Sequence, residues 1–167
     1  MKFFRTLVLI IAFLATTVPI ANLLELPSKL SLDGPVWLSL QQHLSPVLSG
    51  FYGPVEALAL VSCVVLFLVT RRDPEHSHAY LIAAACYLSM ILYFFLFNAP
   101  VNHVLASWTA ATLPANWGQY RLKLETEHVL AALFSLIAFG TLLQARLREN
   151  TAKEPHSQPE RLQMPAE

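Results

Sequence analysis

Four long apolar segments, separated by links that are polar or contain proline, dominate this sequence. They run over residues 3–24, 51–70, 79–97 and 128–145. Each is about as long as a helix needs to cross the roughly 30 Å hydrocarbon core of a bilayer. Lipid offers no hydrogen-bond partners to an exposed backbone, so such segments are helical rather than extended. The sequence therefore predicts an all-α fold, an up-down bundle of four transmembrane helices.

The composition favours a membrane protein and argues against some other classes. Hydrophobic residues make up 55% of the chain and charged residues only 13%, too few to cover a soluble globule. The formal net charge is zero, so the electrostatic signature of a nucleic-acid-binding protein is missing. We expect the lipid bilayer as a partner and no nucleic acid. Cys63 and Cys86 lie in separate apolar segments and are interpreted as buried thiols.

Basic residues gather at alternate links, which sets the expected orientation. The positive-inside rule places both termini and the link after the second segment in the cytoplasm. We therefore expect a multi-pass protein of the inner (plasma) membrane. The basic residues near the cytoplasmic ends are Lys2, Arg5, Arg71, Arg72, Arg146, Arg148 and Lys153.

The expected organisation is one transmembrane domain over residues 1–149, followed by a polar, proline-bearing tail over residues 150–167. The tail has no apolar face and should be disordered. The first apolar segment also has the charged start and apolar middle of a signal peptide. Its apolar stretch is long for that role and no clean A-x-A site follows it, which favours a retained first helix over a cleaved one.

The two outer links carry their own predicted structure. The stretch "GPVWLSLQQHLS" predicts a short amphipathic helix lying at the membrane interface. Pro100 predicts a break or kink near the end of the third segment. Pro114 and Asn116 predict a turn, after which a helix starts near Trp117 and continues into the fourth segment.

Polar side chains gather at the outer end of the predicted bundle. Polar groups at membrane depth are costly and often mark functional sites. We expect them to converge on one pocket at the outer mouth. The candidates for substrate binding are Gln42, His43, Glu56, Asn98, Asn102 and Trp117, and the candidates for catalysis are Arg121, Glu125 and His128.

Helical spacing orders the residues that lead into the fourth segment. Arg121, Glu125 and His128 are separated by four and three residues, so they share one helix face. Trp117 extends that face by a further turn. Glu127 points elsewhere, and we expect it to face another helix or the headgroups, outside the site.

Two interpretations of this face involve no organic ligand. In the first, Arg121 pairs with Glu125 or Glu56 and the network only fixes the helix register. In the second it binds a metal, because Glu-x-x-His is the spacing of the carboxylate-bridged di-iron bundles. The second Glu-x-x-His of such bundles is missing. A mononuclear site from His43, His128 and one Glu would meet the two-His, one-carboxylate requirement.

The third interpretation is a metal-free pocket for an organic ligand. Arg121 would hold an anionic or phenolic oxygen, and His128 or a carboxylate would act as a base. Orienting hydrogen bonds would come from the side-chain amides of Asn98, Asn102 and Gln42.

Several of these stretches resemble the anthrone-oxygenase-like family of small four-helix membrane proteins. They are "WLSLQQHL", "GPVEALAL", "NAPVN" and "WTAATLPANWGQYRLKLETEH", in this order. The resemblance covers nearly everything from the first apolar segment to Ala145. Its most specific part comprises Asn98-x-Pro100-x-Asn102, the pair Trp117 and Arg121, and Glu125-x-x-His128.

The resemblance implies a four-helix membrane fold and an oxidoreductase or oxygenase that uses dioxygen on a small hydrophobic or aromatic compound such as an anthrone. It implies no established cofactor and carries over His128 and Arg121 as site residues. We expect neither a metal nor an organic cofactor. The alternative is a non-catalytic membrane module that binds a ligand, a partner or a metal through the same pocket.

Overall fold

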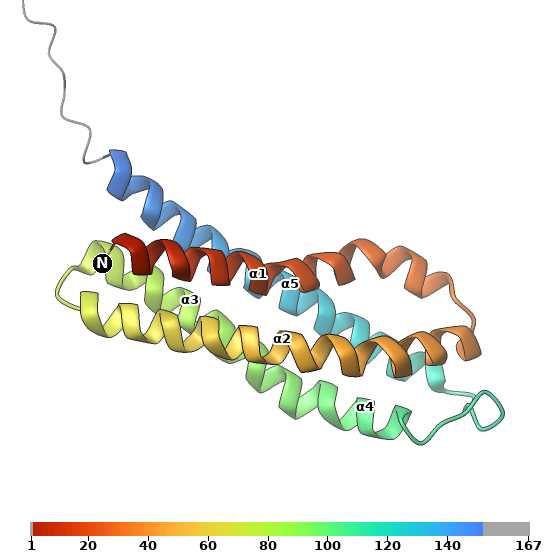
Figure 1. The fold of residues 1–167 in the computed structure, drawn as a ribbon. Coiled ribbons are helices and arrows are strands. Elements are labelled where there is room, and N and C mark those ends of the chain that lie inside the picture. The colour runs from red at the N-terminus through yellow and green to blue at the C-terminus, as the bar shows by residue number, and fades with distance from the viewer. Residues whose placement is uncertain (1, 152–167) are drawn as a thin grey trace, which may run out of the picture.

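The computed structural model describes residues 2–151 as a set of helices (Figure 1). The predicted tail lies outside the described residues, apart from its first two residues, which belong to the last helix. The elements are α1 (Lys2–Ser31), α2 (Gly34–Thr70), α3 (Pro74–Tyr93), the π-helical turn η1 (Phe94–Asn98), α4 (Ala99–Leu105) and α5 (Trp117–Thr151).

Four of these helical stretches are long and apolar enough to cross a membrane. They are α1, α2, the composite of α3, η1 and α4, and α5. The prediction of an all-α protein with four transmembrane helices is confirmed. Figure 1 shows the N-terminus, the link between α2 and α3 and the end of α5 at one end of the bundle. The link between α1 and α2 and the loop before α5 lie at the other end, which we name the outer end.

Small residues bring the helices close together in the main core. Ala12, Ala59, Ala83 and Ala138 come from four different helices and have no exposed surface. Tyr87 fills the space between them and is also fully buried. Small residues at helix contacts let the backbones approach closely, and this compensates for the weak hydrophobic drive between helices in lipid.

A charged cluster joins the first and last helices at the end opposite the outer end. Arg5 of α1 pairs with Glu149 of α5, whose side chain is almost fully buried. Arg146 donates to the same carboxylate at 2.8 Å and to the hydroxyl of Thr6 at 3.0 Å. Because a buried charge needs a partner, this cluster connects α1 to the end of α5.

The prediction of a separate interfacial helix in the first outer link is wrong. Its residues form the first part of α2, which continues for 37 residues. The Asp33 side chain caps the helix by accepting from the backbone N–H of Val36 at 2.9 Å. Trp37 and Leu38 are 1% and 2% exposed in a second core cluster at the outer end. This packing keeps the helix intact although Pro46 and Pro54 lie within it, and each removes one backbone hydrogen bond.

The predicted interruption near Pro100 is confirmed, and it takes the form of a π-turn. The N–H of Ala99 donates to the carbonyl of Phe94, five residues earlier. Such turns commonly occur at functional sites. Asn98 in this turn is 5% exposed, whereas the three residues before it point outward. The turn therefore directs one polar side chain into the bundle.

Candidate functional site

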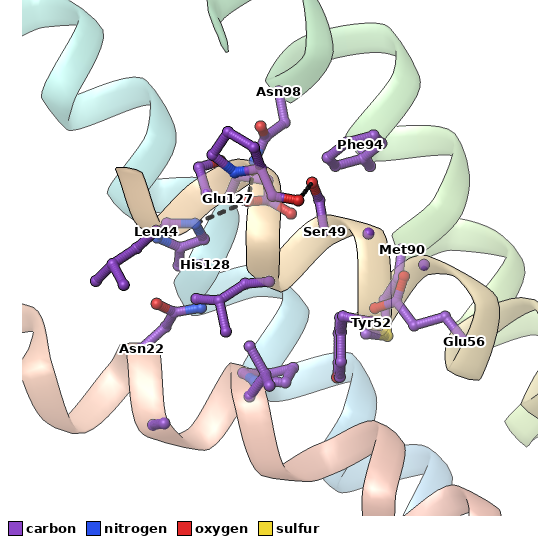
Figure 2. Close-up of a pocket in the computed structure, with 18 of the residues that line it drawn as sticks. Asn22, Leu44, Ser49, Tyr52, Glu56, Met90, Phe94, Asn98, Glu127 and His128 are labelled. Carbon is purple, nitrogen blue, oxygen red and sulfur yellow. Dashed lines mark hydrogen bonds and ion pairs between the residues drawn. The ribbon is translucent and has the colours of Figure 1, made fainter. Parts of the chain in front are cut away.

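A cavity of about 860 Å³ opens in the outer half of the bundle, between α1, α2, the end of α3 with η1, and α5 (Figure 2). We name it the main cavity. Its volume lies in the range typical of sites for small organic ligands, and its surface is mainly apolar. The polar and ionisable residues that line it are Asn22, Glu25, Lys29, Gln41, Ser45, Ser49, Tyr52, Glu56, Asn98, Glu127 and His128.

The imidazole of His128 lies between two buried carboxylates. Its Nδ1 is 3.1 Å from Oε2 of Glu125, and its Nε2 is 3.6 Å from Oε2 of Glu127. Glu125 and Glu127 are 2% and 8% exposed. His128 and Glu127 line the main cavity, whereas Glu125 lies behind the imidazole and away from the cavity. A carboxylate on one ring nitrogen fixes the tautomer and leaves the other nitrogen for chemistry.

Glu127 belongs to the candidate site, contrary to the expectation that it would lie outside. Asn98 Nδ2 donates to Glu127 Oε2 at 2.6 Å, and Figure 2 shows the two side chains beside His128. Consecutive helical residues point about 100° apart, so the wall of a wide cavity can include both. The sequence could not reveal this, because the η1 turn supplies the partner of Glu127.

Arg121 does not reach the main cavity. Its Nη1 donates to the backbone carbonyls of Leu32 at 2.9 Å and Lys29 at 3.4 Å. Its guanidinium carbon lies 4.6 Å from the ring centroid of Trp117. The predicted end of the first helix was near Leu24, but α1 continues to Ser31. The free carbonyls at the end of α1 therefore come within reach of α5, and Arg121 satisfies two of them.

Trp117 is also part of the outer packing rather than the cavity wall. Its ring lies 5.8 Å from that of Trp37, and it packs against the second core cluster. The expected face of Trp117, Arg121, Glu125 and His128 therefore divides into two parts. The first two residues hold the outer end of the bundle together, and the last two form the candidate site.

The polar residues of the first outer link and of α4 have other partners. Gln42 Nε2 donates to the carbonyls of Leu105 at 2.7 Å and Trp108 at 2.9 Å. His43 Nδ1 lies 2.7 Å from the carbonyl of Ser39, and the ring is exposed. Asn102 lines a smaller second cavity of about 530 Å³ with Gln42. Neither Gln42, His43 nor Asn102 lines the main cavity.

The structure thus brings three of the nine predicted residues to the main cavity. Glu56, Asn98 and His128 line it, and Glu125 supports His128 from behind. Glu56 is 9% exposed and comes from the middle of α2, and Figure 2 draws it on the cavity wall. The single polar pocket expected from the sequence is therefore smaller than predicted.

A polar cluster on α1, which is absent from the residues predicted from the sequence, also lines the main cavity. Lys29 is 7% exposed; its Nζ donates to Asn22 Oδ1 at 2.6 Å and lies 3.1 Å from Glu25 Oε2. All three residues line the main cavity. The signal was their spacing of three and four residues, which places them on one helix face. Because the first helix is predicted to end near Leu24, Glu25 and Lys29 fall in the predicted outer link rather than on one face with Asn22.

The structure shows no set of metal ligands in the part of the chain that it describes. No group of three or more His, Cys, Asp or Glu side chains there could hold a metal ion. Glu125, Glu127 and His128 are instead arranged around one another, with the imidazole between the carboxylates. This arrangement suits proton transfer by His128.

Comparison with known proteins gives one match. The family model described as anthrone oxygenase matches residues 49–148. The matched region includes Glu56, Asn98, Glu125, Glu127 and His128, but not α1 or the first part of α2. No curated protein and no solved structure matches the chain. The match confirms the resemblance, and because it covers more than half of the sequence, the protein belongs to the anthrone oxygenase family.

Proposed function

We propose that the protein is a membrane oxygenase that acts on a small hydrophobic aromatic compound bound in the main cavity. The observation that carries the proposal is the imidazole of His128, held by the buried Glu125 at the wall of a mainly apolar cavity. The name of the family to which the chain belongs supports oxygenase chemistry. A base beside an apolar cavity suits a substrate that is flat, uncharged and weakly acidic at carbon.

The surroundings of the cavity suit a substrate that arrives from the lipid. Leu44 and Leu48 of α2 line the cavity and are 45% and 38% exposed. On a helix that crosses the bilayer, such exposed leucines face lipid. An aromatic compound dissolved in the bilayer would therefore enter between helices rather than through water.

The proposed reaction begins with proton transfer. Because Glu125 accepts from Nδ1–H, the free Nε2 of His128 takes a proton from an activated CH2 group of the substrate. The carbanion that remains is delocalised over the rings and gives one electron to dioxygen. The two radicals combine into a peroxide anion, which takes the proton back from the imidazolium of His128. The resulting hydroperoxide loses water to give a ketone. The net change is CH2 + O2 → C=O + H2O, so dioxygen is the only oxidant and no reductant is consumed.

Lys29 takes the role that the sequence analysis gave to Arg121. As the carbanion forms, negative charge moves onto the ring oxygen of a phenolic or ketonic substrate. Lys29 of α1 is a buried cation that lines the same cavity, oriented by Asn22 and paired with Glu25. A fixed cation aimed at developing charge in a water-poor site lowers the barrier to its formation.

Oxygen uptake tests the proposal directly. The purified protein in lipid nanodiscs should consume dioxygen with anthrone as the probe and produce anthraquinone, which is followed by absorbance. The His128→Ala variant should reduce the rate to that of spontaneous oxidation. Ser89→Ala is the matched control, because Ser89 donates only to the carbonyl of Ala85 and does not line the cavity.

Two results would contradict the proposal. Equal rates in wild type and His128→Ala, after subtraction of the spontaneous reaction, would remove His128 as the base. Binding of anthraquinone without any uptake of dioxygen would identify the cavity as a ligand-binding module, which is the alternative from the sequence.

A further inference from the structure

A chain of side-chain amides crosses the bundle and ends on Glu127. Gln41 Nε2 of α2 donates to Asn102 Oδ1 of α4 at 3.4 Å. Asn102 Nδ2 donates to Asn98 Oδ1 in η1, and Asn98 Nδ2 donates to Glu127 Oε2 of α5 at 2.6 Å. Three helical segments that are far apart in sequence are thus joined to the wall of the main cavity.

All of these hydrogen bonds run in one direction. Gln41 donates to Asn102, and Asn102 and Asn98 each accept from the residue before and donate to the next. The last donor meets a carboxylate oxygen. Hydrogen bonds in such a chain polarise one another, and the effect is larger in a low-dielectric interior. Removal of the Asn102 amide should therefore weaken the hydrogen bond from Asn98 to Glu127, although Asn102 and Glu127 share no hydrogen bond.

The chain ends on the oxygen that faces the base. Glu127 Oε2, which accepts from Asn98, is also the oxygen 3.6 Å from Nε2 of His128. This separation is too long for a hydrogen bond. Nε2 is therefore free to accept a proton, while a carboxylate waits close enough to pair with the imidazolium once it forms. Without the amide to hold it, the carboxylate could turn away from this position.

We propose that Asn98 and Asn102 are positioning residues that hold Oε2 of Glu127 3.6 Å from Nε2 of His128. The predicted effect on rate rests on the proposed function, whereas the hydrogen-bonded series of amides does not. Asn102 lines the second cavity and not the main one, so its influence on the reaction passes through Asn98. The η1 turn supports the same arrangement, because it points Asn98 inward while Phe95, Leu96 and Phe97 are more than half exposed.

The first experiment detects the chain without any turnover. Side-chain amide NMR signals are recorded for the full-length protein in nanodiscs, and the Asn98 signal is assigned by its loss in Asn98→Asp. We expect this signal to shift in Asn102→Leu, which removes the donor to the Asn98 oxygen. We also expect a shift in Glu127→Gln, which replaces the charged acceptor of Asn98 Nδ2 with a neutral amide. An Asn98 signal that stays in place in both variants would overturn the proposal.

The second experiment measures the effect on the reaction with anthrone as the probe. Asn102→Leu, which has a similar size but no amide, should lower kcat roughly tenfold and change KM by less than about twofold. Asn102→Gln keeps the donor and should recover most of the rate, since the second cavity has room for one more methylene. Ser107→Ala is the control at the same end of the bundle, because its hydroxyl donates only to Val104.

The outcomes separate the two proposals. A wild-type kcat in Asn102→Leu, or a loss that Asn102→Gln does not restore, would overturn the positioning role while leaving the oxygenase intact. If wild type does not exceed His128→Ala, the proposed function fails, and the NMR signals still decide whether the chain holds Glu127.

Discussion

At the scale of the residue, the two carboxylates beside His128 have different surroundings and different expected roles. Glu125 is packed behind the imidazole, and its Oε1 has no hydrogen-bond partner among residues 2–151. It therefore holds Nδ1 and nothing else in the described chain. Glu127 faces the main cavity and has the amide of Asn98 as a partner. Glu125 is thus expected to orient the imidazole, and Glu127 is expected to stabilise the positive charge that the imidazole acquires.

Replacement of Glu125 by Gln should lower kcat with anthrone by at least about tenfold and change KM little. An amide that donates to Nδ1 would leave the proton on Nε2, where it blocks acceptance from the substrate. The rate is measured by oxygen uptake, with Ser89→Ala, a substitution remote from the cavity, as the reference. A variant as fast as wild type would show that Glu125 does not set the tautomer.

Replacement of Arg121 by Met should reduce stability rather than catalysis. Two carbonyls at the end of α1 would lose a charged donor, at a cost of about 1–3 kcal/mol. A thermal unfolding scan in detergent should therefore show a lower Tm, while kcat of the folded protein is retained. The opposite pattern, a lost kcat at unchanged Tm, would return Arg121 to the reaction as the sequence first suggested.

At the scale of the element, the start of α2 is fitted closely against the start of α5. A Cβ added at Gly34 would lie 2.4 Å from Leu113 Cδ2 and 2.9 Å from Trp117 Cε2. The leucine methyl could move, but the indole is held by Trp37 and Arg121. Gly34 is therefore required by the packing of the outer end.

Gly34→Ala should lower the free energy of unfolding by about 1–3 kcal/mol, the usual cost of overpacking. Gly118→Ala is the matched control, because nothing lies within 4 Å of an added Cβ there, and alanine favours the helix. Thermal scans of both variants in the same detergent make the comparison. Similar Tm values for the two would contradict the close fit at Gly34.

The number and approximate position of the helices could be predicted from the sequence, but the helix ends and the residues of the site could be predicted only in part. Segment length and hydropathy identified four spans, and the start of α5 and the interruption before Pro100 followed from local signals. The continuity of α1 through Pro27 and of α2 through Pro46 could not be read in this way, because tertiary packing overrides the local preference of proline. The first error left Lys29 out of the predicted site, and the second placed Gln42 and His43 in it.

Arg121 and Lys29 illustrate how an error in helix length becomes an error in the site. With the first helix ending near Leu24, the sequence offers Arg121 no backbone carbonyls from that helix, so Glu125 or Glu56 or a bound ligand is its predicted partner. The longer α1 supplies carbonyls to Arg121 and brings Lys29 to the cavity instead. A cation, an imidazole and carboxylates line the main cavity, but which cation it is depends on where the first helix ends.

At the scale of the whole molecule, the distribution of basic residues predicts which end faces the cytoplasm. Arg5 belongs to the start of α1, Arg146 and Arg148 to the end of α5, and Arg71 and Arg72 to the link between α2 and α3. Figure 1 shows these parts of the chain at the end of the bundle opposite the outer end. The positive-inside rule therefore predicts cytoplasmic termini and a main cavity nearer the outer face of the plasma membrane.

Reporter fusions in bacterial cells test this orientation. Alkaline phosphatase, which is active only outside the cytoplasm, should be inactive when fused after Arg148. The same reporter should be active when inserted in the loop between α4 and α5, for example after Ala111. A fluorescent protein that matures only in the cytoplasm should give the reverse pattern, and phosphatase activity after Arg148 would contradict the orientation.

The main cavity has two walls that differ in their relation to the family. The residues beside the proposed base belong to the region that matches the family, whereas the facing wall comes from α1 and the first part of α2, outside residues 49–148. Substitutions in the facing wall therefore change the shape and polarity of the main cavity, while His128 and its carboxylates stay on α5. A chimera that receives residues 2–48 from a relative exchanges Lys29 and Gln41 while it keeps His128 and both carboxylates. It should therefore inherit the relative's choice of substrate, with a rate that depends on whether the relative supplies a cation in place of Lys29.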